Sequence, residues 1–181
     1  MFDSPKHAIT AAARASERHQ ENTENIADAI RAHVVLSNKM SAFEYGCGTC
    51  LLSFELREKI GLITLADNSE GMLEVLQDKI RAESVDDMKP VKLNLSTDPF
   101  PDEQYNLVYT MMTLHHIPDT RHILRQFYAL LNSGGYLCIT DLDKEDGSIH
   151  GHDVANVHKG FDRKELASLA ERKPADRGEG H

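Results

Sequence analysis

The sequence predicts an α/β fold with a doubly wound, mostly parallel sheet and helices on both faces. Between residues 41 and 140, short apolar segments of strand length alternate with segments whose apolar residues recur at helical spacing. Strands that alternate with helices imply crossover connections, and such connections join parallel strands. Five segments have strand character: SAFEYG (41–46), LITLAD (62–67), PVKLNL (90–95), YNLVYT (105–110) and YLCIT (136–140).

Helices are predicted before and between the first strands. Residues 1–40 are expected to be helical, because the stretch from Ala11 to Ala15 is rich in alanine and an apolar stripe follows it. Further helices are expected over residues 50–60 and 70–80, the second with Asn68 or Ser69 as its capping residue. The N-terminal stripe consists of Ile26, Ala27, Ile30, Ala32 and Val34.

Two more helices are predicted in the second half of the chain. One begins at Pro118-Asp119-Thr120 and ends at the pair Gly134 and Gly135, ahead of the last strand. The other covers residues 162–170 and has an Asp-x-x-Glu cap at its start. The polar residues 172–181 are expected to form a disordered tail.

Composition and charge limit the classes of partner. The 181 residues carry a formal net charge of -9, with 29 acidic residues against 20 lysines and arginines. Nucleic-acid binding draws on clustered basic side chains, so we expect no nucleic-acid partner. We find no signal-peptide pattern at the start and no apolar run long enough to span a membrane, and therefore expect a cytoplasmic protein without membrane contact.

The stretch FEYGCGTCLL (43–52) combines two signals. Cys47 and Cys50 have the spacing of a dithiol site or of half a zinc site, but no cation lies nearby and Cys138 falls within a predicted strand. We therefore expect no metal site. Gly46 and Gly48 follow a strand and precede a helix, which is the geometry of a nucleotide-like cofactor loop. The third glycine of the dinucleotide motif would fall at Leu51, which disfavours a nicotinamide site.

Three segments carry a common signal: Glu44 ahead of Gly46 and Gly48, LADNSEGML (65–73), and the stretch 94–119. Together they resemble the class I S-adenosylmethionine-dependent methyltransferases, type 11 small-molecule enzymes in particular. Glu44 with the two glycines is similar to the family's E-x-G-x-G motif, and LADNSEGML (65–73) to its D-x-S-x-x-M-L segment. NLSTDPFPDEQYNLVYTMMTLHHIPD (94–119) is similar to the region around the family's fourth strand. The resemblance covers about residues 40 to 142 and implies a Rossmann-like fold that binds S-adenosyl-L-methionine.

The resemblance also implies which residues contact the cofactor. A carboxylate at the end of the second strand suits two ribose hydroxyls, and Asp67 stands there, although a helix-capping role is the alternative. Asn94 occupies the position of the family's acidic adenine contact, and Cys50 that of its third glycine. The residues expected to bind the cofactor are Glu44, Gly46, Cys47, Gly48, Asp67, Asn68, Met72, Asn94, Leu95 and Thr110.

The acceptor side has less definite signals. His115 and His116 follow the fourth strand, where one of them would face the methyl-transfer site, and a purely structural role is the favoured alternative. His150, His152 and His158 lie in a predicted loop with no ligand-like spacing. We assign no catalytic residue and expect a small-molecule acceptor.

The chain is predicted to be one domain with a shortened C-terminal end. Residues 1–40 form N-terminal helices, 41–142 the cofactor-binding core, 143–171 an acceptor-side loop and helix, and 172–181 the tail. The family's final antiparallel hairpin has no counterpart in the sequence, so YLCIT is expected to be an exposed sheet edge that promotes oligomerisation. The alternative function is a catalytically weak domain that binds the cofactor or a protein partner.

Overall fold

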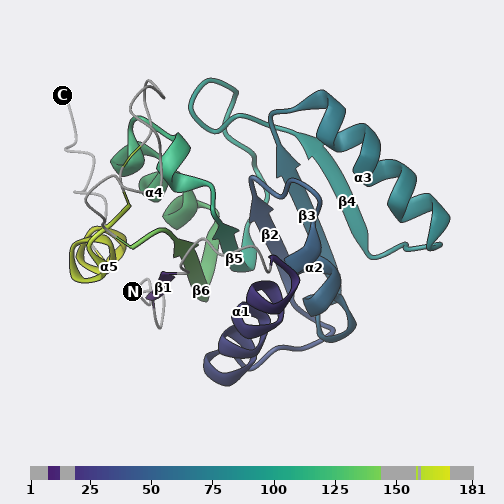
Figure 1. Ribbon diagram of the computed structural model, residues 1–181, viewed down its shortest axis with the longest axis horizontal. Helices are drawn as coiled ribbons and strands as arrows, with labels where there is room; N and C mark the ends of the chain where they lie inside the picture. The colour runs from purple at the N-terminus through teal and green to yellow at the C-terminus, as the bar shows by residue number, and fades with distance from the viewer. Residues whose placement is uncertain (1–7, 13–18, 144–157, 159, 172–181) are drawn as a thin grey trace.

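The structure is a computed structural model that describes residues 8–12, 19–143, 158 and 160–171. These residues form one sheet of parallel strands in the order β1-β6-β5-β2-β3-β4 (Figure 1). The predicted fold class is therefore confirmed. The strands are β1 (Ala8–Ala12), β2 (Ser41–Tyr45), β3 (Leu62–Asp67), β4 (Met88–Lys92), β5 (Tyr105–Met111) and β6 (Leu131–Asp141).

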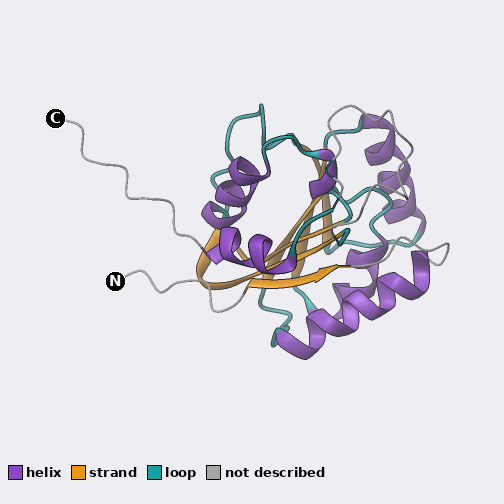
Figure 2. Ribbon diagram, turned by 60° about the vertical axis from the view of Figure 1, so that its left-hand side comes forward, coloured by secondary structure: helices purple, strands orange, loops and turns teal. Residues whose placement is uncertain are grey.

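Helices cover both faces of this sheet (Figure 2). Buried side chains of α1, α2 and α3 share one hydrophobic cluster with one face of the strands, and those of α4 and α5 share a second cluster with the other face. Two short 3-10 helices, η1 and η2, follow α2 and β5. The helical segments are α1 (His19–His33), α2 (Leu51–Leu56), η1 (Arg57–Lys59), α3 (Glu70–Ala82), η2 (Leu114–His116), α4 (Thr120–Ala129) and α5 (Arg163–Glu171).

Strand β2 shows why the central strands are apolar throughout. Ala42 belongs to the cluster under α1 to α3, whereas Phe43 and Tyr45 belong to the cluster under α4 and α5. Successive side chains of a strand point to opposite faces, so a strand covered on both sides has no solvent-facing position. The ring of Tyr45 meets Phe127 of α4 edge-on, with 5.5 Å between the ring centroids. The acidic residue of this strand, Glu44, is buried as well.

The N-terminal prediction was wrong for residues 8–12. They form β1, which pairs in parallel with β6 from Ala8 opposite Leu137 to Ala12 opposite Asp141. Alanine favours helices by less than about 1 kcal/mol per residue over most residue types, and the backbone hydrogen bonds offered by a sheet edge outweigh that preference here. The prediction that YLCIT forms an exposed sheet edge was also wrong, because β1 pairs with this strand and covers it. Residues 13–18 lie outside the described part of the chain.

The apolar stripe of α1 is largely as predicted. Ile26, Ala27, Ile30 and Val34 are buried against α2 and the sheet, but Ala32 is exposed. The buried positions follow the spacing i, i+1, i+4 and i+8, which keeps them on one side of a helix with 3.6 residues per turn. Ala32 falls on the opposite side of the helix.

Several predicted boundaries moved, and β6 covers residues 131–141 instead of 136–140. Helix α4 ends at Ala129, not at the glycine pair, because the Tyr105 N–H donates to the Leu130 carbonyl (2.7 Å) and Leu131 already pairs with β5. Strand β4 covers residues 88–92 instead of 90–95. The Leu93 N–H donates to the Asp67 carbonyl at 3.0 Å and closes the ladder, so Asn94 and Leu95 lie beyond the strand.

The C-terminal part agrees with the prediction where it is described. The Asp162 carboxylate accepts hydrogen bonds from the N–H groups of Lys164 and Glu165, both at 2.9 Å, and caps α5. Beyond β6, residues 158 and 160–171 contain no antiparallel hairpin. The predicted tail (172–181), His150 and His152 lie outside the described residues. Among the helices that are described, none has the length and apolar character needed to cross a membrane.

Candidate functional site

A cavity of about 520 Å³ opens at the carboxyl ends of β2, β3 and β5. The chain leaves β2 for β3 and β4 on one side and returns to β5 on the other, so β2 and β5 flank the point at which the strand order reverses. Ligands of open α/β sheets bind at this point. The cavity is lined by Tyr45, Gly46, Gly48, Asp67, Asn68, Met72, Met112, Thr113, His116 and Ile117.

The loop after β2 requires glycine at Gly46. Its φ angle is +69°, a left-handed conformation, and its N–H donates to the Ala66 carbonyl of β3 at 2.8 Å. A Cβ atom at this position would overlap the side chain of Thr113, whose hydroxyl donates to the Gly46 carbonyl at 3.3 Å. Gly48 is also left-handed, with φ +50°. Backbone, and not side chain, therefore forms this wall of the cavity.

Asp67 connects this loop to the start of α3. Its Oδ2 atom accepts from the Gly48 N–H and its Oδ1 atom from the Ser69 N–H, each at 2.9 Å. Ser69, and not Asp67, is the capping residue of α3, since its hydroxyl oxygen accepts from the Met72 N–H at 3.4 Å. Each oxygen of an ionised carboxylate has a further lone pair for a ligand hydroxyl. The carboxylate is thus held in a fixed position at the cavity wall.

Glu44 lies behind the loop and does not line the cavity. Its Oε2 atom accepts from the Ser53 hydroxyl and, at 3.9 Å, from the Cys50 thiol. The Ser53 hydroxyl also contacts the Tyr109 hydroxyl. Burial raises the pKa of Glu44 to about 8, because the hydrogen bonds from Ser53 and Cys50 lower it by less than desolvation raises it. Glu44 is therefore a supporting residue and carries a proton at neutral pH.

Cys50 stands where the resemblance places a glycine, and it adopts the conformation that a glycine favours. Its φ angle is +58°, and its N–H donates to the Cys47 carbonyl at 2.7 Å just before α2. The thiols of Cys47 and Cys50 are both buried. A hydrogen bond with Cys47, followed by burial, raises the pKa of the Cys50 thiol, and burial raises that of Cys138 to about 12. A reactive cysteine needs a lowered thiol pKa, so Cys50 and Cys138 do not have the properties of reactive thiols.

Besides Glu44, four more of the predicted contacts lie outside the cavity wall. Cys47 is part of the hydrophobic cluster under α2. Thr110 and Leu95 both hold Tyr45: the Thr110 hydroxyl donates to the Tyr45 carbonyl at 2.9 Å, and the Leu95 N–H donates to the Tyr45 hydroxyl at 3.2 Å. Asn94 forms a turn in which its N–H donates to Asp98 at 2.7 Å.

Sequence reasoning did not select four of the lining residues: Tyr45, Met112, Thr113 and Ile117. Tyr45 stands inside the E-x-G-x-G motif and could have been found from it. Met112 is left-handed, with φ +54°, directly after β5. The sequence contains no signal for a left-handed methionine, because this conformation depends on the surrounding structure.

The two histidines after β5 have different environments. His115 is buried, and its Nδ1 atom lies 2.7 Å from Oδ1 of Asp141. The Asp141 carboxylate also accepts from the N–H groups of Leu114 (2.7 Å) and Leu142 (2.8 Å), so it orders the whole segment. His116 is exposed and lines the cavity, with its ring centroid 3.9 Å from that of His115. The structural role predicted for the pair fits His115, whereas His116 faces the site.

A family model described as a methyltransferase domain matches residues 42–135, which contain the glycine loop, Asp67 and both histidines. The chain belongs to this methyltransferase family. The resemblance to class I methyltransferases is thereby confirmed. A curated relative, the demethylmenaquinone methyltransferase of Listeria welshimeri, is 33% identical over 98 residues, which cover 52% of this chain and 42% of that protein. This methyltransferase domain thus matches less than half of the relative's length.

Solved structures share the fold of the domain. One is a SAM-dependent methyltransferase from Aquifex aeolicus, with a TM-score of 0.66 and 17% identity, covering 87% of this chain and 81% of that one. Another is the [4+2]-cyclase SpnF, with a TM-score of 0.70 and 18% identity, covering 93% and 62%. At these identities the likeness shows the methyltransferase fold alone.

Proposed function

We propose that the domain uses S-adenosyl-L-methionine to methylate a small molecule. The observation that carries the proposal is Asp67, which stands at the end of β3 in the cavity wall and is held by the N–H groups of Gly48 and Ser69. A ribose with two free hydroxyls is a fitting partner for such a carboxylate, because each oxygen can accept one hydroxyl. The cavity volume of about 520 Å³ lies within the usual range for small-molecule sites.

The remaining lining residues fit the rest of this cofactor. The backbone at Gly48 leaves room for close approach, since a Cβ atom there would meet only Met72 within 4 Å, whereas the space beside Gly46 is taken by Thr113. Asn68 and Met72 lie beside Asp67 at the start of α3 and would contact the nucleoside end. The adenine contacts expected of Asn94 and Leu95 stay a prediction, as do the cofactor contacts expected of Glu44, Cys47 and Thr110.

The acceptor would lie at the β5 side of the cavity, next to Thr113, His116 and Ile117. The cofactor supplies a methyl group already activated by a sulfonium, so the domain mainly holds the two reactants in line. An acceptor that arrives as a hydroxyl or an ammonium must lose a proton. The His116 imidazole is in a position to take it, with His115 and Asp141 fixing the segment behind it. The name of the Listeria relative supports a small-molecule acceptor.

Thermal unfolding with S-adenosylhomocysteine, and separately with NADH, tests the cofactor. At a concentration one hundred times its dissociation constant, a ligand of the folded state adds about 2.7 kcal/mol of stability. We expect this stabilisation from S-adenosylhomocysteine and none from NADH. Stabilisation by NADH alone would contradict the proposal. Binding of S-adenosylhomocysteine without methyl transfer to demethylmenaquinone or to other small acceptors would favour the alternative of a domain that binds the cofactor only.

A further inference from the structure

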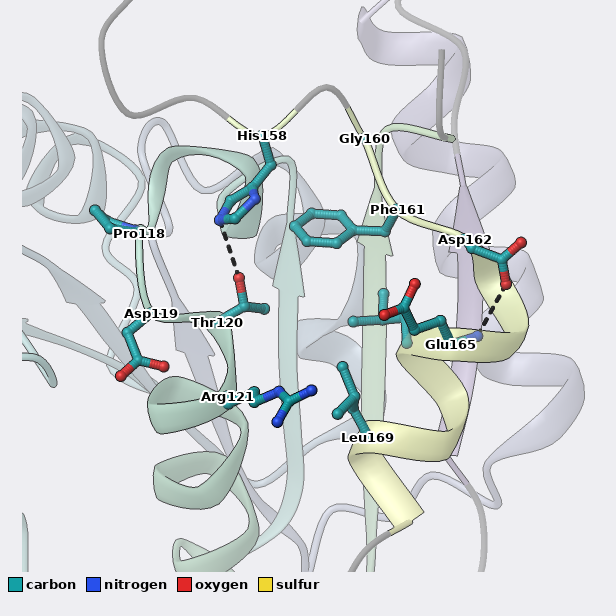
Figure 3. A pocket seen from close by; sticks show the side chains of 11 residues that line it. Pro118, Asp119, Thr120, Arg121, His158, Gly160, Phe161, Asp162, Glu165 and Leu169 are labelled. Atoms are coloured by element: carbon teal, nitrogen blue, oxygen red, sulfur yellow. Dashed lines mark hydrogen bonds between the residues drawn. The ribbon is translucent and has the colours of Figure 1, made fainter.

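A second cavity, of about 350 Å³, lies between α4 and α5 (Figure 3). It shares no lining residue with the first, although Ile117 lines one cavity and the next residue, Pro118, lines the other. Its volume restricts it to a small ligand. The walls are formed by Pro118, Asp119, Thr120, Arg121, His158, Gly160, Phe161, Asp162, Glu165, Leu166 and Leu169.

The backbone around this cavity is fixed by hydrogen bonds. The Phe161 N–H donates to the Leu142 carbonyl at 2.9 Å, which ties the start of α5 to the end of β6. His158 connects the opposite side: its N–H donates to the His115 carbonyl at 2.8 Å and its Nε2 atom to the Ile117 carbonyl at 2.9 Å. These bonds fix the positions of Phe161 and His158 in the cavity wall.

One wall is apolar and is formed by α5 and by Phe161, which precedes it. Leu166 is buried, and Phe161 and Leu169 are half-buried, all within the cluster under α4 and α5. Figure 3 shows the Phe161 ring and the Leu169 side chain along the same side of the space. This wall suits a hydrocarbon or aromatic group.

Two opposite charges face this space from different helices. Arg121 reaches from α4 toward α5, and the Glu165 carboxylate turns into the same space from α5 (Figure 3). Among the described residues neither makes an ion pair, whereas nearby Arg163 pairs with Asp143 through two nitrogens at 2.7 and 2.5 Å. Arg121 and Glu165 are thus free to pair with a ligand.

The two other carboxylates in the wall already have partners. Oδ1 of Asp119 accepts from the His122 N–H at 2.9 Å and caps α4, and Oδ1 of Asp162 caps α5 in the same way. Carboxylates at these positions also offset the positive ends of the helix dipoles. Their main role is structural, which leaves Arg121 and Glu165 as the charges available for recognition.

We infer that the cavity between α4 and α5 binds a small zwitterion with an apolar side group, which is the chemistry of an apolar amino acid. Its carboxylate would pair with Arg121, its ammonium with Glu165, and its side group would pack on Phe161, Leu166 and Leu169. An anion without the ammonium would face Glu165 unpaired, and a cation without the carboxylate would face Arg121 unpaired. The inference goes beyond the proposed function, because this binding needs neither the methyl donor nor methyl transfer.

Calorimetric titration with three matched probes tests the inference on the full chain. L-phenylalanine has both charges, 2-phenylethylamine lacks the carboxylate and 3-phenylpropionate lacks the ammonium, while the aromatic ring is kept. We expect phenylalanine to bind roughly two- to fivefold more tightly than either of the others, as solvent-accessible charge pairs allow. Equal affinities for all three probes, or no binding of phenylalanine, would overturn the inference.

Two variants assign the charges. Arg121→Ala should remove the advantage of phenylalanine over phenylethylamine only, and Glu165→Ala its advantage over phenylpropionate only. Arg125→Ala is the matched control, because Arg125 is exposed one turn further along α4 and does not line the cavity. Unchanged selectivity in both variants, or the same loss in Arg125→Ala, would contradict the assignment. Affinity for S-adenosylhomocysteine should be the same in all three variants, which separates this site from the proposed function.

Discussion

The two cavities are built in different ways. The cavity at the ends of β2, β3 and β5 is formed by the backbone at Gly46 and Gly48 and by one carboxylate held by two N–H groups. The cavity between α4 and α5 is formed by residues of these two helices and of the segments just before them, with Arg121 on one side and Glu165 on the other. The first is fixed by local backbone geometry, whereas the second depends on how two helices pack on the sheet.

The largest expected effect concerns the support beneath the glycine loop. Glu44 is protonated in the folded protein up to a pKa of about 8, against an ordinary value of 4.5. Between these values the folded state binds more protons than the unfolded state, so stability falls as pH rises. The contribution of the neutral carboxyl is complete below about pH 4.5 and is lost as pH rises through 8. This corresponds to a total decrease on the order of 5 kcal/mol.

Chemical denaturation of the wild type and of Glu44→Gln, from pH 5 to pH 9, measures this decrease. The glutamine variant keeps an uncharged side chain of similar shape. Any misfit of this side chain therefore changes the unfolding free energy by the same amount at every pH and leaves its pH dependence unaffected. The difference in unfolding free energy between wild type and variant should fall steadily up to about pH 8 and then level off. A difference that stays constant over the whole range would show that Glu44 is ionised in its network.

A smaller effect is expected from the backbone that forms the first cavity. In Gly46→Ala, the new methyl group would overlap Thr113 and occupy a left-handed conformation, with an expected cost of about 2–4 kcal/mol. Gly71→Ala is the matched control, since Gly71 lies in α3 and has no atom near the position of a Cβ. That substitution should stabilise the protein by about 0.4–1 kcal/mol. Equal effects of the two substitutions in thermal unfolding would refute the role of the loop backbone.

The sequence predicted most of the fold because the central strands and helices have local patterns. The boundaries of β2 and β3 and the caps at Ser69 and Asp162 could be read from residue types, since each depends on neighbours within a few positions. Strand β1 could not, because it depends on a hydrogen-bonding partner more than 120 residues away. The change from α4 directly into β6 likewise depends on pairing with β5.

The candidate site was predictable to the extent that it follows motifs. Gly46, Gly48 and Asp67 were identified by their order and spacing, and they line one cavity. Thr113 and Met112 were missed, since their positions depend on how the end of β5 meets the glycine loop. No part of the cavity between α4 and α5 was foreseen, because Arg121 and Glu165 look like ordinary solvent-facing charges in the sequence.

The central claim is that Asp67 binds the ribose of S-adenosyl-L-methionine, and calorimetric titration of S-adenosylhomocysteine into Asp67→Asn tests it most directly. The substitution removes the negative charge and turns an amide N–H₂ toward one of the N–H groups that now hold the carboxylate. Glu74→Gln is the control, because Glu74 is exposed on α3 and does not line the cavity. We predict that Asp67→Asn, once shown to be folded, binds roughly tenfold to 150-fold more weakly than Glu74→Gln and the wild type. A folded Asp67→Asn variant with unchanged affinity would contradict the claim.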